Sequence, residues 1–301
     1  MNNWINELKE LNIGKIETSV SLKKYTTYKI GGKASCIVYP KNTTNLIKLL
    51  KFARRKNIKY KMLGNGSNLI FSDKDYDGIL IKLNEFNHIE VYGRKIKVGA
   101  GYSLMKLSRI AQKNALTGLE FAAGIPGTVG GAIFMNAGAY KSDMGYIVQT
   151  VKVLTPDYKV VEFENKELGF HYRTSFLKKH KDFICLEAVL RLEKGDKIMI
   201  AEVMKNRLKR RVESQPLNYP SAGSVFRNPK DMFAGELIEK AGLKGKQIGG
   251  AMISDKHANF IVNTGNATSE DVKKLITLAQ ETVKEKYDVD LLLEQEYVNW
   301  E

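Results

Sequence analysis

The sequence has few cysteines, few histidines and no long apolar run, and each shortage limits what the protein can be. Cys36 and Cys185 are the only cysteines, neither has a paired or metal-type spacing, and both are expected to be small buried hydrophobes. The four histidines show no ligand spacing with acids or thiols, so no catalytic metal is expected. No apolar run approaches the roughly 18 residues that cross a bilayer. Membrane insertion is therefore not expected.

The N-terminus also lacks an export signal. Met1-Asn2-Asn3-Trp4 does not have the basic-then-apolar pattern of such a signal. Together with the sparse cysteines, this predicts a protein of the reducing cytoplasm.

Acidic residues are outnumbered, 33 against 48 Lys and Arg, which leaves a net charge of +15. Such an excess raises the hypothesis of a nucleic-acid-binding protein. The lysines, however, are spread along nearly the whole chain, and they are not interleaved with aromatics as a stacking platform requires. We therefore favour a lysine-rich solvated surface without a nucleic-acid partner, whose positive field helps collect phosphate-bearing ligands.

At 301 residues the chain exceeds what one core usually fills, so more than one domain is expected. Apolar residues three or four apart predict helices at 4–11, 45–57, 104–114, 200–212 and 272–287. Two hairpins are predicted, 89–92 with 95–98 and 151–154 with 160–163. The fold class is therefore α+β. The charged segment 193–197 separates a strand-like run from a basic helix, so the main domain boundary is placed there.

Glycines gather in loops that follow one another within eighty residues. They are Gly64-Asn65-Gly66-Ser67-Asn68-Leu69, the strip 118–132 with Gly124-Ile125-Pro126-Gly127-Thr128-Val129-Gly130-Gly131, and Asn136-Ala137-Gly138. Glycine lets backbone N–H groups approach a bulky anion, so a phosphate-bearing ligand is more plausible than three ordinary turns. The Rossmann fingerprint and its acidic ribose ligand are not found, which disfavours that site.

A second motif, 219–229, presents Ser224 on a Gly-Ser turn beside Arg227 and Asn228. With the glycine loops and the stretches 27–32, 172–176, 241–251, 257–263 and 293–296, it forms an ordered set over nearly the whole chain. This set resembles the UDP-N-acetylenolpyruvoylglucosamine reductase (UDP-N-acetylmuramate dehydrogenase, MurB) family. The short spacing between Arg173 and Ser224 is similar to the form of the family that lacks a substrate-covering tyrosine loop.

The resemblance implies an FAD-binding domain of the vanillyl-alcohol-oxidase (PCMH) type at 1–193, with two subdomains split near 80. A smaller α+β substrate-binding domain is implied at 194–301, with the C-terminal strand returning to the active site. The implied reaction is the NADPH-dependent reduction of UDP-N-acetyl-3-O-(1-carboxyvinyl)glucosamine to UDP-N-acetylmuramate through FAD. This reaction belongs to bacterial peptidoglycan precursor synthesis, and we expect a monomer.

The resemblance also implies roles for residues. Ser224 is the implied proton donor, and Arg173 and Glu296 stabilise the intermediate. FAD binding is expected at Gly64, Asn65, Gly66, Ser67, Asn68, Leu69, Gly124, Ile125, Pro126, Gly127, Thr128, Gly130, Gly131, Asn136, Ala137 and Gly138. Substrate contacts are expected from Tyr172, Arg227, Asn228, Gln247 and His257.

Two alternatives remain open from the sequence, a flavin oxidase on the same scaffold and a basic binding protein. Many such oxidases tether flavin through a histidine in the glycine loop, whereas Asn65, Ser67 and Asn68 occupy this stretch, so noncovalent FAD is expected. One departure is visible. The family usually has glycine after Ala-Gly-Ala-Tyr, where this chain has Lys141-Ser142-Asp143, which puts the conformation of that turn in question.

Overall fold

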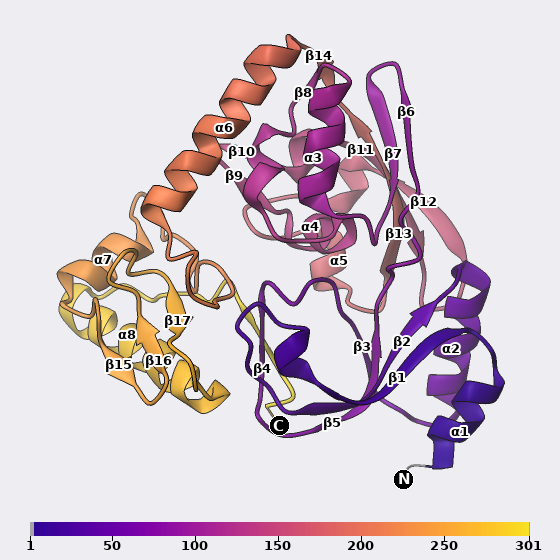
Figure 1. Cartoon of the computed structure of the whole chain (residues 1–301), viewed down its shortest axis with the longest axis horizontal. Helices are drawn as coiled ribbons and strands as arrows, with labels where there is room; N and C mark the ends of the chain where they lie inside the picture. The colour runs from indigo at the N-terminus through magenta and orange to yellow at the C-terminus, as the bar shows by residue number, and fades with distance from the viewer. Residues whose placement is uncertain (1–2, 301) are drawn as a thin grey trace. The chain divides into compact units, whose positions relative to one another are not determined.

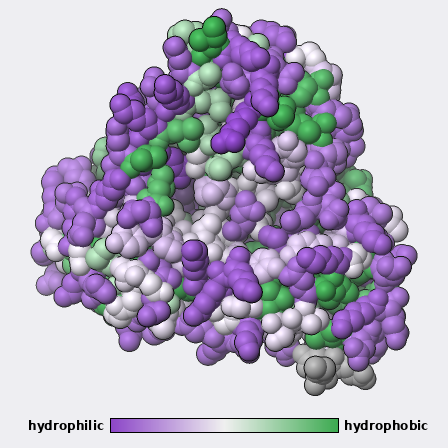
Figure 2. All heavy atoms as spheres, viewed as in Figure 1, coloured by the Kyte–Doolittle hydropathy of each residue, from purple (hydrophilic) through white to green (hydrophobic). Residues whose placement is uncertain are grey.

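The computed structural model describes residues 3–300. Met1 and Asn2, part of the segment tested for an export signal, lie outside the described residues, as does Glu301. Helices and strands are mixed along the chain in an α+β arrangement (Figure 1), which confirms the expected fold class. Hydrophilic side chains cover most of the face in Figure 2 and are interrupted by scattered apolar residues, which fits a solvated, lysine-rich surface.

All five predicted helices are confirmed. They are α1 (Asn3–Glu10), α2 (Thr43–Arg55), α3 (Leu104–Lys113), α6 (Lys197–Ser214) and α8 (Ser269–Tyr287). Asn42, Ser103 and Thr268 cap α2, α3 and α8 with side-chain oxygens, because each accepts a first-turn N–H that has no partner inside the helix. Three shorter helices are α4 (Val129–Met135), α5 (Phe176–Lys179) and α7 (Ala234–Lys240). No helix of residues 3–300 is long and apolar enough to cross a membrane.

Contacts divide the chain into two compact units. Unit 1 comprises 1–17, 36–64 and 78–210, and unit 2 comprises 18–35, 65–77 and 211–301. Three of the divisions fall inside strands β1 (Gly14–Ser21), β2 (Lys33–Pro40) and β5 (Tyr76–Ile81), which with β3 (Tyr60–Met62) form a sheet of order β1-β2-β5-β3. The other two fall at 64/65, in the first glycine loop, and at 210/211, inside α6. The expected boundary at 193/194, with its functional assignment, stays a prediction.

The main sheet of unit 1 has the order β12-β11-β13-β7-β6. Its strands are β6 (Ile89–Tyr92), β7 (Lys95–Gly99), β11 (Val148–Leu154), β12 (Val160–Glu164) and β13 (Ile184–Arg191). Both predicted hairpins are confirmed, with Val91 opposite Ile96 and Val153 opposite Val161. Helices α3 and α4 bury Leu107 and Ile133 in the same core as this sheet. Cys36 and Cys185 are free and buried, as expected, and burial raises the pKa of each thiol to about 12.

Short pairs complete unit 1, namely β8 (Leu116–Thr117) with β14 (Glu193–Lys194), and β9 (Gly138–Ala139) with β10 (Ser142–Asp143). Ala139 pairs with Ser142, so Tyr140 and Lys141 form the turn, and both have positive φ (55° and 58°). Positive φ at both central residues is the type I′ arrangement, which glycine adopts without strain. The departure at Lys141 therefore places a lysine where the turn favours glycine.

Unit 2 is built on the three-stranded sheet β15 (Gln247–Ile248), β16 (Ala251–Ile253) and β17 (Ile261–Asn263). Helix α8 packs on it, because Val272, Leu275 and Ile276 share one buried cluster with Ala251 and Ile253. The C-terminal strand β18 (Glu296–Val298) pairs in parallel with β4 (Leu69–Phe71), so that Glu296 lies opposite Leu69. The chain end is thereby brought beside the strand that follows the first glycine loop.

Candidate active site

The first glycine loop is held by hydrogen bonds of its own backbone and its neighbours. Gly66 has a φ of +62°, and a Cβ there would lie 2.2 Å from the Tyr25 carbonyl oxygen. The fold itself therefore requires this glycine. Asn68 donates from Nδ2 to the Glu294 carbonyl (3.0 Å) and accepts from the Glu296 N–H (2.9 Å). In unit 1, the buried Lys82 ammonium donates to the Gly64 carbonyl, and burial lowers its pKa to about 8.

The strip 124–131 contains a glycine that the protein's own packing does not explain. Thr128 caps α4 by accepting the Gly131 N–H at 3.3 Å, and a Cβ on Gly130 would press on Ala100 at 3.0 Å. At Gly127, by contrast, a Cβ would meet no described atom within 4 Å. A side chain at this position would enter open space. Because glycine has no side chain, that space stays free for a ligand. The strip therefore fits a bound FAD.

Asn136 connects this strip to the segment that carries Arg173. It ends α4 with a φ of 45°, donates from Nδ2 to the His171 carbonyl (2.9 Å) and accepts the Gly145 N–H (2.9 Å). Its buried side chain is thus used to join loops of unit 1. We therefore expect any FAD contact from this segment to come from its backbone, at Ala137 and Gly138, and not from the Asn136 side chain.

Arg173 lies in a tight turn closed by His171 and Thr174, which exchange two backbone hydrogen bonds of 3.1 Å. Its φ is 55°, a region that L-residues other than Asn and Asp rarely adopt. Backbone strain of this kind, of order 1–3 kcal/mol, collects at functional sites. The guanidinium donates from Nη2 to the Gly138 carbonyl (2.9 Å) and lies over the Tyr172 ring, 5.2 Å from its centroid.

The Ser224 segment in unit 2 is the middle strand of a short ladder. On one edge, the Arg227 N–H donates to the Leu292 carbonyl and the Glu294 N–H donates to the Val225 carbonyl, both at 2.9 Å. Phe226 and Leu293 form an antiparallel bridge between these bonds. The chain turns at Gly223, whose φ is +74°. The turn thus places Ser224 at the end of this ladder.

Asn259 holds the other edge of the same segment. Its backbone carbonyl accepts the Val225 N–H (2.9 Å), its side-chain oxygen accepts the Phe226 N–H (2.9 Å), and its Nδ2 donates to the Phe226 carbonyl (2.8 Å). The Asn259 N–H in turn donates to Nδ1 of His257 (3.2 Å), so that nitrogen carries no proton. Burial lowers the pKa of His257, and Lys244 lowers it further. His257 therefore supports the serine segment through Asn259.

Glu296 begins β18 and is half-buried, with its backbone N–H bonded to Asn68. Among the expected substrate residues, Arg227 has a buried Nε that bonds to no described residue, and a buried donor of this kind calls for a ligand or water. Asn228 accepts the Ala234 N–H at 3.1 Å, and Gln247 donates to the Gly249 carbonyl at 2.9 Å. Tyr172 is half exposed beside Arg173.

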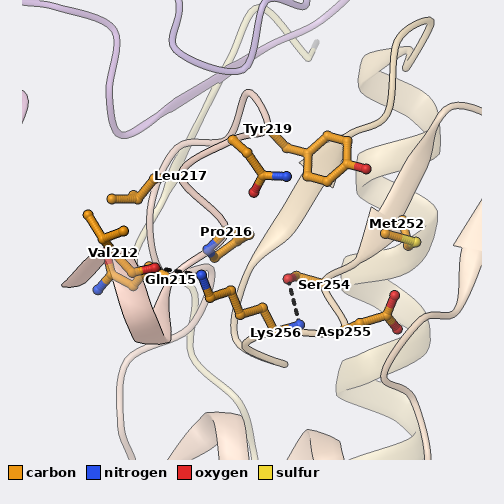
Figure 3. Close-up of a pocket in the computed structure, with 10 residues that line it drawn as sticks. Val212, Gln215, Pro216, Leu217, Tyr219, Met252, Ser254, Asp255 and Lys256 are labelled. Atoms are coloured by element: carbon orange, nitrogen blue, oxygen red, sulfur yellow. Dashed lines mark hydrogen bonds between the residues drawn. The ribbon is translucent and has the colours of Figure 1, made fainter. Parts of the chain in front are cut away.

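A cavity of about 400 Å³ lies in unit 2, next to the chain that leads into the serine segment. In Figure 3, the Lys256 side chain reaches the Val212 carbonyl, and Ser254 lies beside the Lys256 backbone. The cavity is lined by Val212, Gln215, Pro216, Leu217, Asn218, Tyr219, Met252, Ser254, Asp255 and Lys256. The last of these lining residues, Lys256, directly precedes His257, which is one of the residues expected to contact the substrate.

The expected site residues are therefore divided between the two units. Gly64, the strip 124–131, 136–138 and the Tyr172-Arg173 turn belong to unit 1, and the remaining ones belong to unit 2. Sequence reasoning missed Lys82, Asn259 and Gln295. Asn259 and Gln295 lie in stretches that carry the resemblance but were given no role, and Lys82 belongs to no motif. Only the folded chain brings each of them to a glycine or serine loop. Among residues 3–300, no group of three His, Cys, Asp or Glu residues could hold a metal ion.

Two protein families match the chain. A family described as an FAD binding domain matches residues 34–164, and one described as the C-terminal domain of UDP-N-acetylenolpyruvoylglucosamine reductase matches residues 215–298. UDP-N-acetylenolpyruvoylglucosamine reductase 1 of Bacillus cereus is 46% identical over 99% of both chains. The reductase of Bacillus subtilis is 44% identical over the same share.

Two solved structures are also similar. The UDP-N-acetylenolpyruvylglucosamine reductase of Thermus caldophilus has a TM-score of 0.80 and 37% identity, covering 94% of this chain and 98% of that one. The Phl p 4 variant described as a glucose oxidase has a TM-score of 0.50 and 16% identity, covering 65% of this chain and 45% of that one. The second likeness concerns the fold alone. Together with the family matches, it confirms the expected FAD-binding fold of the vanillyl-alcohol-oxidase type.

Proposed function

The chain belongs to the UDP-N-acetylenolpyruvoylglucosamine reductase family, and we propose that Ser224, Arg173 and Glu296 carry out its reaction. The protein reduces UDP-N-acetyl-3-O-(1-carboxyvinyl)glucosamine to UDP-N-acetylmuramate with NADPH and FAD, in peptidoglycan precursor synthesis. The observation that carries this function is the 46% identity over 99% of the chain. It also sets aside the flavin oxidase and the basic binding protein as alternatives.

Bound FAD, once reduced by NADPH, supplies the hydride that the terminal carbon of the enol ether receives. We propose that it is held noncovalently by the loops 64–69, 124–131 and 136–138. The open space at Gly127 supports this assignment, because the backbone there is accessible without any clash inside the protein. The loop 64–69 offers Asn65, Ser67 and Asn68 but no histidine for a covalent bond.

Arg173 stabilises the negative charge that builds on the substrate carboxylate after hydride addition. Its planar guanidinium can present two parallel N–H groups to a carboxylate. The bond to the Gly138 carbonyl and the Tyr172 ring fix the direction of the side chain, so little reorganisation is needed as the charge develops.

Ser224 donates the proton that completes the reaction. A serine hydroxyl is a weak acid, but the accepting carbon is a strong base at that stage, so the proton transfer is favourable. Glu296 assists through a hydrogen bond. Its place at the start of β18, bonded to the end of the first glycine loop, supports this role.

We propose contacts to the sugar nucleotide from Tyr172, Arg227, Asn228, Gln247 and His257. The buried Arg227 Nε supports an anionic ligand, since it has no partner among residues 3–300. We further propose a cytoplasmic monomer with an FAD-binding domain at 1–193 and a substrate-binding domain at 194–301. Size-exclusion chromatography with light scattering checks the monomer, and a dimer would contradict it.

The cofactor assignment is tested at Gly127. The Gly127→Val variant should purify folded but with lower FAD occupancy, because the new side chain fills the ligand space without touching the protein. Occupancy is read from the ratio of flavin to protein absorbance, and folding from far-UV circular dichroism. A folded Gly127→Val protein that is fully yellow would remove this loop from the FAD site.

The proton-donor role is tested by separating the two half-reactions of Ser224→Ala. NADPH should reduce its flavin at nearly the native rate, because that step needs no proton at the substrate carbon. Reoxidation by the enolpyruvyl substrate should slow by at least the roughly 10²–10⁴-fold typical of a lost general acid. Ser224→Cys should recover part of the loss, since a thiol is the stronger acid. Anaerobic stopped-flow absorbance reads both steps, and native-rate reoxidation would refute the role.

A further inference from the structure

On the N-terminal side of Val225, the serine segment is no longer paired with the backbone of the C-terminal chain. The C-terminal chain pairs with Arg227, Phe226 and Val225 in turn, but at Gln295 a side chain replaces the ladder. Its Nε2 lies 3.2 Å from the Ala222 carbonyl, 3.1 Å from that of Gly223 and 3.4 Å from that of Ser224. One amide thus faces every backbone oxygen of the turn that presents Ser224.

The orientation of this amide follows from chemistry. The oxygen and nitrogen of a glutamine are assigned from their hydrogen-bond partners, and three carbonyl oxygens accept hydrogens but have none to give. The NH₂ end must therefore face the turn. The Gln295 oxygen then points away from the turn, and it is buried with no hydrogen-bond partner among residues 3–300.

Tyr28 provides the complementary group. Its side chain is fully buried and its hydroxyl makes no short hydrogen bond among residues 3–300. The Gln295 side chain is nevertheless close enough to act on it as a hydrogen-bonding group, which partly offsets the effect of burial on the Tyr28 pKa. Burial raises the Tyr28 pKa well above its ordinary value, so the hydroxyl keeps its proton and can donate. The Tyr28 hydroxyl is therefore a buried donor that needs an acceptor, and the Gln295 oxygen is a buried acceptor that needs a donor. Leaving either of them without a hydrogen bond is costly.

We propose that Gln295 is a positioning residue that holds the Ala222–Ser224 turn, with its amide oriented by a hydrogen bond from the Tyr28 hydroxyl. This inference rests on the proposed proton-donor role of Ser224. The Ser224 hydroxyl is attached directly to Cβ, so its place depends closely on the backbone of the turn. Gln295 fixes that backbone at the three carbonyls where the ladder has ended.

The first test replaces Gln295 with methionine, which has a similar shape but no hydrogen to donate. Gln295→Met should reoxidise about 10–100-fold more slowly with the enolpyruvyl substrate, because small displacements of reacting groups cost up to about 10² in rate. Its reduction by NADPH should stay within about twofold of native. Gln280→Met is the matched control, since Gln280 also donates to a backbone carbonyl of unit 2, that of Leu291 at 2.9 Å. It should alter neither half-reaction.

A double variant distinguishes this inference from the role of Ser224. If Gln295 acts through the serine hydroxyl, Gln295→Met should slow reoxidation of the native protein but add almost nothing to Ser224→Ala. Equal slowing in both backgrounds, or no slowing in the native one, would overturn the positioning role while Ser224→Ala still reports on the proton donor. If Ser224→Ala alone reoxidises at the native rate, the proposed function of the serine fails, and this inference fails with it.

A pH profile provides a readout that general loosening of the fold would not produce. In Gln295→Glu, only the protonated carboxyl can donate to the turn, and the carboxylate repels the three carbonyl oxygens. Its reoxidation rate should therefore fall as pH rises through the pKa of that new carboxyl, relative to the native profile over the same range. Tyr28→Phe should slow reoxidation by a smaller factor, about three- to tenfold, since the amide keeps its donors but loses its orientation. A Gln295→Glu profile parallel to the native one would contradict the proposal.

Discussion

The Arg173 turn and the Ser224 turn present their side chains by different means. At Arg173 the unusual backbone conformation, with φ at 55°, belongs to the proposed catalytic residue itself. At Ser224 the positive φ is taken by the preceding glycine, Gly223 at +74°, and the serine is followed by a ladder bonded along both edges. The positive φ thus belongs to one proposed catalytic residue itself, where it is strained, and to the glycine that precedes the other, where it is not.

The reach of each side chain explains the difference. A guanidinium lies several bonds from its Cα and is aimed by its own contacts, here the Gly138 carbonyl and the Tyr172 ring. A serine hydroxyl lies one bond beyond Cβ, so any backbone displacement moves it directly. Hence the serine segment has backbone bonds on both edges and amide bonds from Asn259 and Gln295. The Arg173 turn is closed by two backbone bonds, and the Asn136 amide and the Lys178 ammonium donate to its His171 and Arg173 carbonyls.

The largest expected effect comes from Arg173. Arg173→Ala and Arg173→Gly should both slow reoxidation by about 10²–10³-fold, the usual loss on removing a donor to developing negative charge. The glycine variant should nevertheless be more stable than the alanine variant by about 1 kcal/mol, because glycine adopts the positive φ without strain. Chemical denaturation measures the second difference. Equal stability of the two variants would show that the turn holds no strain at this position.

Gly223→Ala tests the opposite arrangement and should have a smaller effect. A Cβ there would meet no described atom within 4 Å, so its cost is backbone strain alone, about 1–2 kcal/mol. Relief of that strain moves the turn, and reoxidation should slow about tenfold. Gly242→Ala is the matched control, with a φ of +81° and equally open surroundings. It should lose similar stability and keep native kinetics, and equal kinetic losses in both variants would contradict the comparison.

Local patterns predicted the five longest helices and two hairpins of the main sheet, but not the short strands of the other sheets. The five helices and two hairpins follow from periodicity and turn residues within short windows, and the structure confirms them. The residues that support the serine were not predictable, because the Gln295 amide reaches a turn 71 to 73 residues earlier in the chain. The positive φ of Arg173 was equally hidden, since the sequence offers no glycine or asparagine there. Asn136 was expected to bind FAD, and the structure adds that its side chain bonds the loops around Arg173.

The smallest expected effect is a pH dependence of stability, which we expect for the serine segment but not for the Arg173 turn. The Gly138 carbonyl that receives Arg173 does not titrate near neutrality, whereas the Asn259 that clamps the serine segment donates to Nδ1 of His257. Burial lowers the His257 pKa, a backbone hydrogen bond and Glu239 partly oppose this, and Lys244 lowers the pKa further. Below pH 6.5, the unfolded chain takes up a proton that the folded protein resists. Stability should therefore be complete above that pH and fall as pH decreases, by at most about 1.4 kcal/mol per pH unit.

Denaturation of the native protein and of His257→Gln between pH 7.5 and 5.5 checks this, because glutamine does not titrate and all other groups cancel in the difference. The stability advantage of the native protein should shrink toward low pH. Reoxidation by the enolpyruvyl substrate should slow over the same range in the native protein, since protonating Nδ1 removes the acceptor that orders Asn259. An advantage that stays constant or grows at low pH would show that His257 does not support the serine segment in its neutral form.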